Sequence, residues 1–407
     1  MSAPTDGPST PVAAPPHAGP SSHPGPGPGE PAREVLAARG YLSRVAEPPA
    51  GALAALVAEV GPVEAADRVR TGHVDQRVAA ETSARRDVHR VAADLAAAAA
   101  AGLRLVTPEH AEWPAEAFTA FAPHGPGGLI APLALWVRGR GRLDLLCERA
   151  VALVGSRAAT RYGTQMAAEL ASGVAERGWT VVSGAAIGID GAAHRGALAV
   201  GGPTVAVLAC GADRAYPAAH QGLLERILDT GAVVSEYPPG CVPGRHRFLV
   251  RNRLIAGLTA GTVVVEAGLR SGAQRTAADA TALGRDVLAV PGPVTSSVSA
   301  GCHRLIREGA VLVTRADEVL EAVGRIGADL AAPPGVGHDR ATDGLSTVAA
   351  LVHDALPARA AREAAWLALE AGVPVGAVRA ALVELERRGL VQHFDGRWQR
   401  SATRRRA

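Results

Sequence analysis

The spacing of apolar residues changes along the chain, and it is most informative between Ala150 and Thr314, where short apolar runs alternate with helical stretches. The runs are VALVG, TVVSG, TVAVLA, AVVSE, TVVVEAG, DVLAVPG and VLVT. They are continuous rather than alternating and rich in valine, as strands covered on both faces are. Helices are expected between them, for example over Gly163–Arg177 and Ala192–Val200. This repetition predicts a doubly wound parallel sheet of the extended Rossmann type over residues 106–324.

The region before the sheet has a helical pattern. Residues 32–105 are predicted to form a small helical domain that includes one long helix from Thr82 to Ala101. The turn at Gly61 and Pro62 between two helices has the outline of a helix-hairpin-helix module, whose turn amides can contact phosphates. A plain helical hairpin produces the same pattern more often, so both interpretations stay open.

The region after the sheet predicts a C-terminal winged-helix domain. A loose linker over residues 325–344 is followed by three helical segments and by QHFDGRWQR, a hairpin with its turn at Asp395 and Gly396. The winged helix is expected over residues 345–400. Its third helix mixes arginines with Glu384 and Glu386, so docking to a protein fits it at least as well as binding to duplex DNA.

The two ends of the chain have biased compositions. Ten of the 29 prolines fall within residues 1–31, mixed with glycine, serine and threonine. Such a segment buries too little apolar surface to offset its ordering entropy, so it is expected to be disordered. Residues 401–407 form an arginine-rich tail that would add only nonspecific attraction for anions.

Charge and cysteine content narrow the class of protein. The net charge is only +3, so a surface for nucleic acid must be local. All 42 basic residues are arginine, and their position therefore says more than their identity. The four cysteines are far apart and contain no C-x-x-C pair, which disfavours disulfides and zinc. With neither a signal-peptide pattern nor a long apolar run, a cytoplasmic location without membrane contact is expected.

Candidate chemistry lies at the carboxyl edge of the predicted sheet, where three strands are each followed by small or hydroxyl residues and a helix start. These pairs are Ser156 and Arg157, Ser183 and Gly184, and Ser271 and Gly272. Exposed amides at helix starts attract anions, and hydroxyl and guanidinium groups add donors. Three such turns at one edge predict a ligand that carries phosphate. The spacing matches neither the dinucleotide fingerprint nor the P-loop, so no bound cofactor is expected.

A basic segment, GCVPGRHRFLVRNRLIAGL, spans residues 240–258, and no carboxylate occurs between Glu236 and Glu266. Its first arginines and His246 are expected in an extended loop, with a helix starting near residue 251. Guanidinium groups along a loop can follow a phosphate backbone while an aromatic ring stacks on a base, as in single-strand binding. The expected contacts are Arg245, Arg247, Phe248, Arg251, Asn252 and Arg253. The alternative is that Phe248 belongs to the core and the arginines form a solvated face.

Seven motifs in sequence carry a resemblance to a known family. They are GSRAATRYG, SGAAIGIDGAAHRGAL, GADRAYPAAHQGLLERI, SEYPPG, FLVRNRLIAGLT, VVVEAGLRSGAQRTAADA and AVPGPVTSSVSAGCHRLI. Over about residues 105–320 the chain resembles the DNA-processing protein A family (DprA, also called Smf). The resemblance implies a non-enzymatic protein that binds single-stranded DNA, forms a homodimer and helps load the RecA recombinase during natural transformation. It also implies DNA contacts at the first two strand ends and in the FLVRNR motif.

Three positions depart from the family pattern. Ile187 stands where the family often has arginine, Leu249 replaces a usual proline, and His303 stands where asparagine is common. These departures bear on the strength of the DNA contacts.

Two enzymatic interpretations compete with binding alone. Asp190 and His194 lie four residues apart on one predicted helix, and Ser156 or Ser183 could serve as a nucleophile. A simpler interpretation has Asp190 as a helix N-cap and His194 packed beside the sheet. Alternatively, Glu266 could act as in Rossmann enzymes that hydrolyse nucleotide phosphoribosyl bonds, although their P-G-G-x-G-T-x-x-E run is missing.

Overall fold

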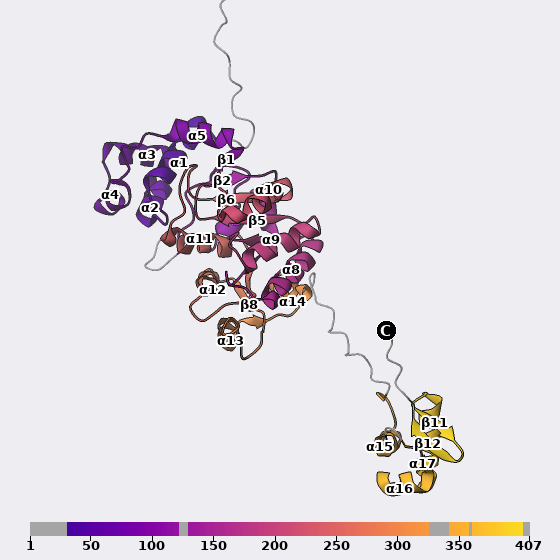
Figure 1. Ribbon diagram of the computed structural model, residues 1–407. Coiled ribbons are helices and arrows are strands. Elements are labelled where there is room, and N and C mark those ends of the chain that lie inside the picture. The colour runs from indigo at the N-terminus through magenta and orange to yellow at the C-terminus, as the bar shows by residue number, and fades with distance from the viewer. Residues whose placement is uncertain (1–30, 122–128, 325–341, 358–359, 402–407) are drawn as a thin grey trace, which may run out of the picture. The chain divides into compact units, whose positions relative to one another are not determined.

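The computed structural model describes residues 31–121, 129–324, 342–357 and 360–401. These residues belong to two compact units, divided between Ala331 and Ala332 (Figure 1). Most of the predicted proline-rich tail, of the linker and of the arginine tail lies outside the described residues.

In the described part of the first unit, nine strands form one sheet in the order β1-β2-β6-β5-β4-β3-β7-β8-β9. Their bounds are β1 Leu103–Val106, β2 Leu135–Arg138, β3 Ala150–Val154, β4 Thr180–Ser183, β5 Thr204–Leu208, β6 Ala232–Ser235, β7 Gly261–Val264, β8 Asp286–Ala289 and β9 Val311–Leu312. The strands from β3 to β9 pair in parallel, which confirms the predicted doubly wound sheet. The antiparallel pairs of β1 with β2 and of β2 with β6 were not predicted, and the boundary expected at residue 105 falls inside β1.

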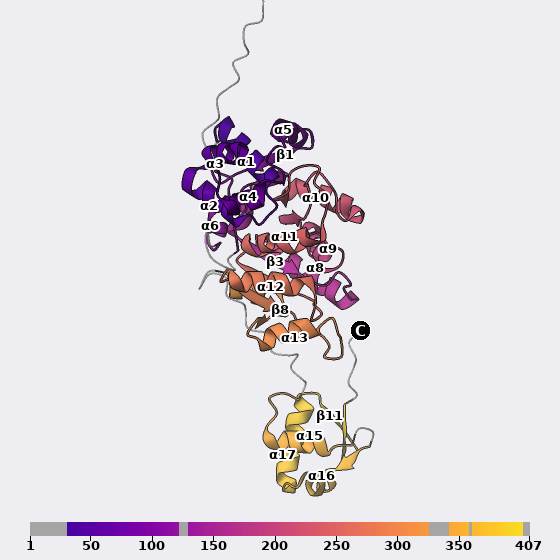
Figure 2. The ribbon, with the colours of Figure 1, turned by 90° about the vertical axis from the view of Figure 1, so that its left-hand side faces the viewer.

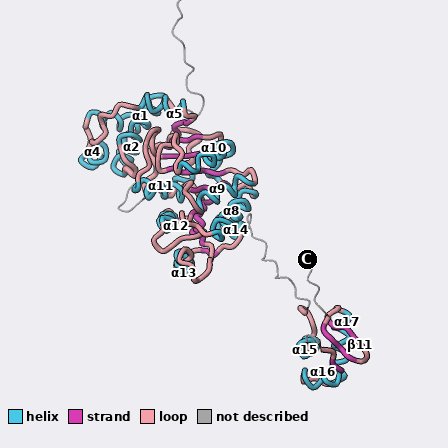
Figure 3. The backbone as a smooth tube through the Cα atoms, in the orientation of Figure 1, coloured by secondary structure: helices cyan, strands magenta, loops and turns pink. Residues whose placement is uncertain are grey.

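Both faces of the sheet are buried, which explains the continuous apolar runs. Along β3, Ala152 and Val154 belong to one core cluster, whereas Val151 and Leu153 belong to another. Helices α8 (Arg161–Glu176) and α9 (Ile189–Ala199) cover the face of Val151 and Leu153. Helices α11 (Arg245–Gly257) and α12 (Gly272–Ala282) cover the other face. Figures 1 and 3 show the strands between these two helical layers.

Further helices connect the strands within the described part of the first unit. They are α6 Ala115–Phe118, α7 Leu143–Glu148, the 3₁₀ helix η1 Ala218–His220, α10 Gln221–Thr230, α13 Ala300–Arg307 and α14 Ala316–Val323. The next strand along the chain, β4, pairs with one edge of β3, and β7 pairs with the other edge. The strand order therefore reverses between β3 and β7. In open α/β sheets, ligands bind at the carboxyl ends of the strands at such a switch point.

The helical region packs against the sheet within the same compact unit. It consists of α1 Arg33–Val45, α2 Gly51–Val60, α3 Pro62–Thr71, α4 Gln76–Thr82 and α5 Val91–Ala100, with Leu42, Leu53 and Val69 in its core (Figure 2). The long helix predicted from Thr82 to Ala101 is wrong in its first half, because residues 83–87 form turns and residues 88–90 are irregular. The Tyr41 hydroxyl donates a hydrogen bond of 2.8 Å to the Arg86 carbonyl and ties these turns to α1.

The second unit contains three helices and a small sheet among its described residues. These are α15 Thr347–Ala355, β10 Arg362–Glu363, α16 Ala364–Ala371, α17 Val375–Arg387, β11 Val391–Phe394 and β12 Arg397–Arg400. Asp395 and Gly396 both have positive φ, 45° and 77°, as a two-residue hairpin turn requires. The three helices and the hairpin agree with the expected elements, and the winged-helix assignment stays a prediction. Arg362 and Glu363 form a strand where a helix was expected.

The helices of the described residues were also compared with the length and apolarity that a bilayer span requires. None is both long and apolar enough on its own, and one sharply bent pair, α16 with α17, meets the length and composition criteria jointly.

Candidate nucleic-acid interface

A cavity of about 780 Å³ opens at the carboxyl ends of β3 and β7, at the switch point of the sheet. Eight of the twelve predicted site residues line it. They are Ser156, Arg157, Arg245, Phe248, Arg251, Asn252, Ser271 and Gly272. The other four do not line it, and these are Ser183, Gly184, Arg247 and Arg253. Most of the residues predicted from sequence therefore lie at this cavity, whereas the other four lie elsewhere in the fold.

Backbone hydrogen bonds to neighbouring segments hold the turn after β3 in place. The Ser156 amide donates a 2.7 Å hydrogen bond to the Glu266 carbonyl, and the Ser156 carbonyl accepts one of 3.2 Å from the Ile189 amide. Gly188 has φ of 91°, and a Cβ there would lie 2.3 Å from the Ser156 carbonyl oxygen, so only glycine permits this approach. The turn is thus fixed while the Ser156 side chain and the exposed Arg157 line the cavity.

An aromatic platform forms the rim of the cavity. The ring centroids of Phe248 and Tyr216 are 5.4 Å apart, and the Arg157 guanidinium carbon lies 5.0 Å from the Phe248 centroid. Phe248 is half-buried at this rim and is outside the core clusters of the sheet. Rings placed next to cations can stack on bases while the cations contact phosphates. Sequence reasoning missed Tyr216, although it lies in the quoted motif GADRAYPAAHQGLLERI.

Arg251 places a buried positive charge at the cavity. Arg251 is only 4% exposed. Its Nη1 donates hydrogen bonds to the Gly184 carbonyl, at 2.8 Å, and to the Val207 carbonyl. Burial lowers the pKa of Arg251 to about 10, so the group stays charged at neutral pH. Its Nε finds no hydrogen-bond partner among the described residues. A fixed cation with a spare donor favours an anion in the cavity.

The second strand end serves the protein's own packing. The Ser183 hydroxyl donates a 2.6 Å hydrogen bond to the Leu153 carbonyl and so ties β4 to β3. A Cβ on Gly184 would lie 2.3 Å from Arg251 Nη1, so this glycine makes room for the guanidinium. Neither Ser183 nor Gly184 lines the cavity, and their contacts with a ligand stay a prediction.

Two arginines of the basic segment point to carboxylates of the chain. Arg253 donates to both Glu236 oxygens, at 2.7 and 2.8 Å. Arg247 donates to both Glu47 oxygens, at 2.7 and 3.0 Å. The predicted extended loop is also wrong, because α11 begins at Arg245. The segment lacks carboxylates of its own, but its partners lie just before it and 200 positions away.

The start of α12 faces the cavity from the other side. Ser271 is the N-cap of α12 but makes no side-chain capping bond, and its hydroxyl has no partner among the described residues. Asn252 Nδ2 lies 3.4 Å from the Gly272 carbonyl and links α11 to this helix start. Unfilled amides at a helix start, with a hydroxyl beside them, suit a phosphate oxygen.

The acidic residues proposed for catalysis are engaged in the fold. Glu266 is 2% exposed, accepts hydrogen bonds from the Thr160 amide (2.9 Å) and hydroxyl (2.6 Å), and does not line the cavity. This carboxylate caps the start of α8, where a phosphoribosyl-binding role would need it free. Asp190 lines the cavity, but the N-cap of α9 is Gly188, so the predicted N-cap is wrong. Burial raises the pKa of Asp190, partly offset by the charge of Arg251.

Of His194 and the three family departures, only Leu249 lines the cavity. His194 is fully buried with Nδ1 2.7 Å from the Thr204 hydroxyl, and burial lowers its pKa to about 3. Leu249 lines the cavity rim and is 54% exposed, and Ile187 is 47% exposed. His303 Nε2 lies 2.9 Å from the Gly292 carbonyl, away from the cavity lining.

The described ranges contain no group of three or more His, Cys, Asp or Glu side chains that could hold a metal ion. All four cysteines are free thiols, and three of them are buried.

Residues 104–324 match the family described as DNA recombination-mediator protein A. The chain is 55% identical over 363 residues to a DprA-type DNA processing protein of Mycobacterium tuberculosis, a match that covers 88% of this chain and 92% of the relative. It is 46% identical over 190 residues to the DNA processing protein DprA of Streptococcus pneumoniae, covering 47% of this chain and 66% of that one. The X-ray structure of the Streptococcus pneumoniae DprA superimposes with a TM-score of 0.59 at 32% identity, covering 72% of this chain and 98% of that chain.

Proposed function

Because the chain belongs to the DNA recombination-mediator protein A family, we propose that it binds single-stranded DNA in the cavity between the ends of β3 and β7. The observation that carries the proposal is the Phe248–Tyr216 ring pair with Arg157 beside it. In a duplex the faces of the bases are stacked and covered, so rings that offer a stacking face select an unpaired strand. Arg245, Arg251 and the start of α12 line the same cavity and would contact the phosphates.

We further propose that the bound strand is protected and passed to the RecA recombinase, in recombination or natural transformation. The family's role as a recombination mediator supports this step, since a mediator must hold a single strand and release it to a recombinase. In this proposal the protein acts in the cytoplasm as a homodimer, and its C-terminal unit is a winged helix that binds DNA or protein.

The protein is proposed to act without catalysing a reaction on the strand. Glu266, the carboxylate that a phosphoribosyl hydrolase would need, is buried against Thr160. His194 contacts Thr204 below the cavity and is held neutral by burial, so it is poorly placed to activate a nucleophile. A nucleotide-release assay tests this point, and release of a free base from a nucleoside monophosphate would overturn it.

The test of the main proposal is a titration of the full chain against a labelled oligonucleotide, once single-stranded and once as a duplex. Tighter binding of the single strand, with an affinity that falls steeply as salt rises, is the expected result. Equal binding of both forms, or an affinity independent of salt, would contradict it. Repeating the titration with purified RecA tests the transfer step: RecA filaments should form faster on the strand with this protein than without it.

A further inference from the structure

The first turn of α11 is locally unfavourable. Arg245, His246 and Arg247 occupy it, no acidic residue is present there, and the N-cap Gly244 supplies no side-chain bond. The start of a helix carries partial positive charge and unpaired amides, so cations there are destabilising. This turn nevertheless carries Arg245 and Phe248 to the cavity. Something outside the helix must therefore hold it in place.

Arg247 is the anchor of this turn. Its guanidinium donates through Nε and Nη2 to Glu47, at 2.7 and 3.0 Å, and through Nη1 to the Val242 carbonyl at 2.8 Å. The guanidinium carbon also lies 4.5 Å from the centroid of the Tyr237 ring. Only 13% of the Arg247 side chain is exposed. Three of its N–H groups donate to these acceptors and one face of the guanidinium packs over Tyr237, so Arg247 is engaged in fixing the turn.

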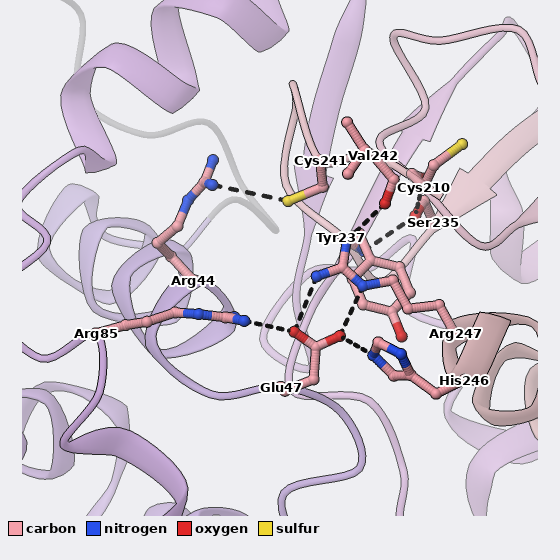
Figure 4. A network of polar contacts seen from close by, with 10 residues as sticks. All are labelled: Arg44, Glu47, Arg85, Cys210, Ser235, Tyr237, Cys241, Val242, His246 and Arg247. Carbon is pink, nitrogen blue, oxygen red and sulfur yellow. Dashed lines mark hydrogen bonds and ion pairs between the residues drawn. The ribbon is translucent and has the colours of Figure 1, made fainter. Parts of the chain in front are cut away.

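Glu47 supplies the negative charge that the turn lacks. It lies between α1 and α2 in the helical region and also accepts hydrogen bonds from Arg85, at 2.8 Å, and His246, at 3.0 Å. Figure 4 shows Arg247, His246 and Arg85 converging on its carboxylate from two sides. Burial alone would raise the pKa of Glu47, but the hydrogen bonds from Arg247, Arg85 and His246 outweigh it and lower the pKa to about 2. The carboxylate is therefore ionised at neutral pH.

We propose that Glu47 is a positioning residue for strand binding, through which the helical region sets the first turn of α11 and with it Arg245 and Phe248. This inference rests on the proposed function, and it gives the helical region a part in DNA binding without a DNA contact of its own. The Arg247 side chain, predicted from sequence as a phosphate contact, becomes the link between the two regions.

Simple electrostatics and positioning predict opposite effects when Glu47 loses its charge. A carboxylate near a phosphate-binding site repels the ligand, so its removal alone would tighten binding. If Glu47 positions the turn, its removal instead frees Arg247 and loosens the contacts that Arg245 and Phe248 make. The sign of the change thus separates the two effects.

The test compares Glu47→Gln with Glu109→Gln in the full chain. Glu109 also joins the helical region to the sheet, through Arg39 at 2.5 and 3.1 Å, and among the described residues no hydrogen bond or ion pair joins it to α11. We expect Glu47→Gln to bind a single-stranded oligonucleotide about tenfold more weakly, a typical coupling between two sites, and Glu109→Gln to bind like the wild type. Unchanged or tighter binding by Glu47→Gln would overturn the inference.

Hydrogen exchange without DNA gives a second measurement that does not depend on the proposed function. The amides of residues 245–250 should exchange faster in Glu47→Gln but not in Glu109→Gln, while the amides of β3 stay protected in both. Unchanged exchange in α11 would also overturn the inference. Failure of the wild type to bind any single strand would refute the proposed function, and the exchange result would still decide whether Glu47 holds the turn.

A double variant tests whether Glu47 acts through Arg247. If Glu47 acts through Arg247, then Glu47→Gln combined with Arg247→Gln should bind no more weakly than Arg247→Gln alone. Losses that add in the double variant would show independent actions and overturn the inference.

Discussion

Arg253 and Glu236 form a two-pronged ion pair in which the side chains are only 3% and 7% exposed. Glu236 directly follows β6, so the pair fastens α11 to the sheet, and Arg253 Nε adds a 2.9 Å hydrogen bond to the Ile130 carbonyl. Arg253, one of the two arginines of the Arg–Asn–Arg triplet that were predicted to contact DNA, is thus tied to the fold. Its neighbour Arg251 faces the cavity, two positions away.

The pair leads to a prediction about stability. Arg253→Met should lower the free energy of unfolding by about 3–5 kcal/mol, because Glu236 would remain buried and unpaired. The double variant Arg253→Met with Glu236→Met should recover much of this loss. Protection of the β3 and β7 amides in hydrogen exchange measures both. Arg68→Ala, at the exposed pair with Glu64, is the matched control and should leave protection nearly unchanged.

Phe248→Ala tests the aromatic platform. Loss of a stacked base should weaken single-strand binding by about 1–3 kcal/mol, measured by anisotropy of a labelled oligonucleotide. Phe394→Ala, at an exposed ring in the second unit, should have no such effect if the cavity holds the strand. An affinity unchanged by Phe248→Ala would leave the rings without a role in binding.

Arg157→Ala tests the phosphate contact at the end of β3. We expect weaker binding to oligonucleotides of every sequence, because a phosphate contact carries no base information. The slope of log affinity against log salt should become shallower by about 0.7, the value for one phosphate of a single strand. Arg226→Ala, an exposed arginine on α10, is the control. A loss confined to particular sequences would argue for a base contact instead.

The buried His194 predicts a dependence of stability on pH. Burial lowers its folded pKa from 6.5 to about 3, so the unfolded chain takes up a proton below pH 6.5 while the folded chain does not. The contribution of the neutral His194 to the free energy of unfolding is therefore fully present above pH 6.5 and is lost as the pH falls toward 3. His194→Asn, which can keep a hydrogen bond to Thr204, should remove about 1.4 kcal/mol per pH unit from the slope of unfolding free energy in this range.

The exposed His73 offers the control for that measurement. The variant His73→Asn should keep the wild-type slope between pH 6.5 and 3, as judged by hydrogen exchange of the central strands. Identical slopes for His194→Asn and the wild type would mean that His194 is already protonated, or solvated, in the folded chain.

The parallel sheet was predictable because its strands β3 to β7 are covered on both faces and therefore appear as unbroken apolar runs. The strands β1 and β2 were missed because neither belongs to the repeating strand–helix pattern that marks the parallel strands, although they are as long as β4 and β6. The cavity could be located because the ends of neighbouring parallel strands meet at one edge. Tyr216 was missed because it lies well beyond the end of β5, in the loop that leads to η1, and not directly after a strand.

The division of labour among the arginines could not be predicted from local sequence. Arg247 and Arg251 are four positions apart on one helix, yet one contacts Glu47 and the other lines the cavity. What distinguishes them is the partner that the fold brings to each, and for Arg247 that partner is 200 positions away. Counting carboxylates within the segment therefore said little about which guanidinium groups are free.

The antiparallel pair β1–β2 has a consequence for how the chain is made. Its sheet partner β6 leaves the ribosome only after β3, β4 and β5 and their helices have been synthesised. Until then one edge of β2 has open backbone donors and acceptors, and Trp136, later fully buried, has no cover from β6. The nascent N-terminal half is therefore exposed to mispairing until β6 has been made, and slow translation before β6 would lengthen that interval.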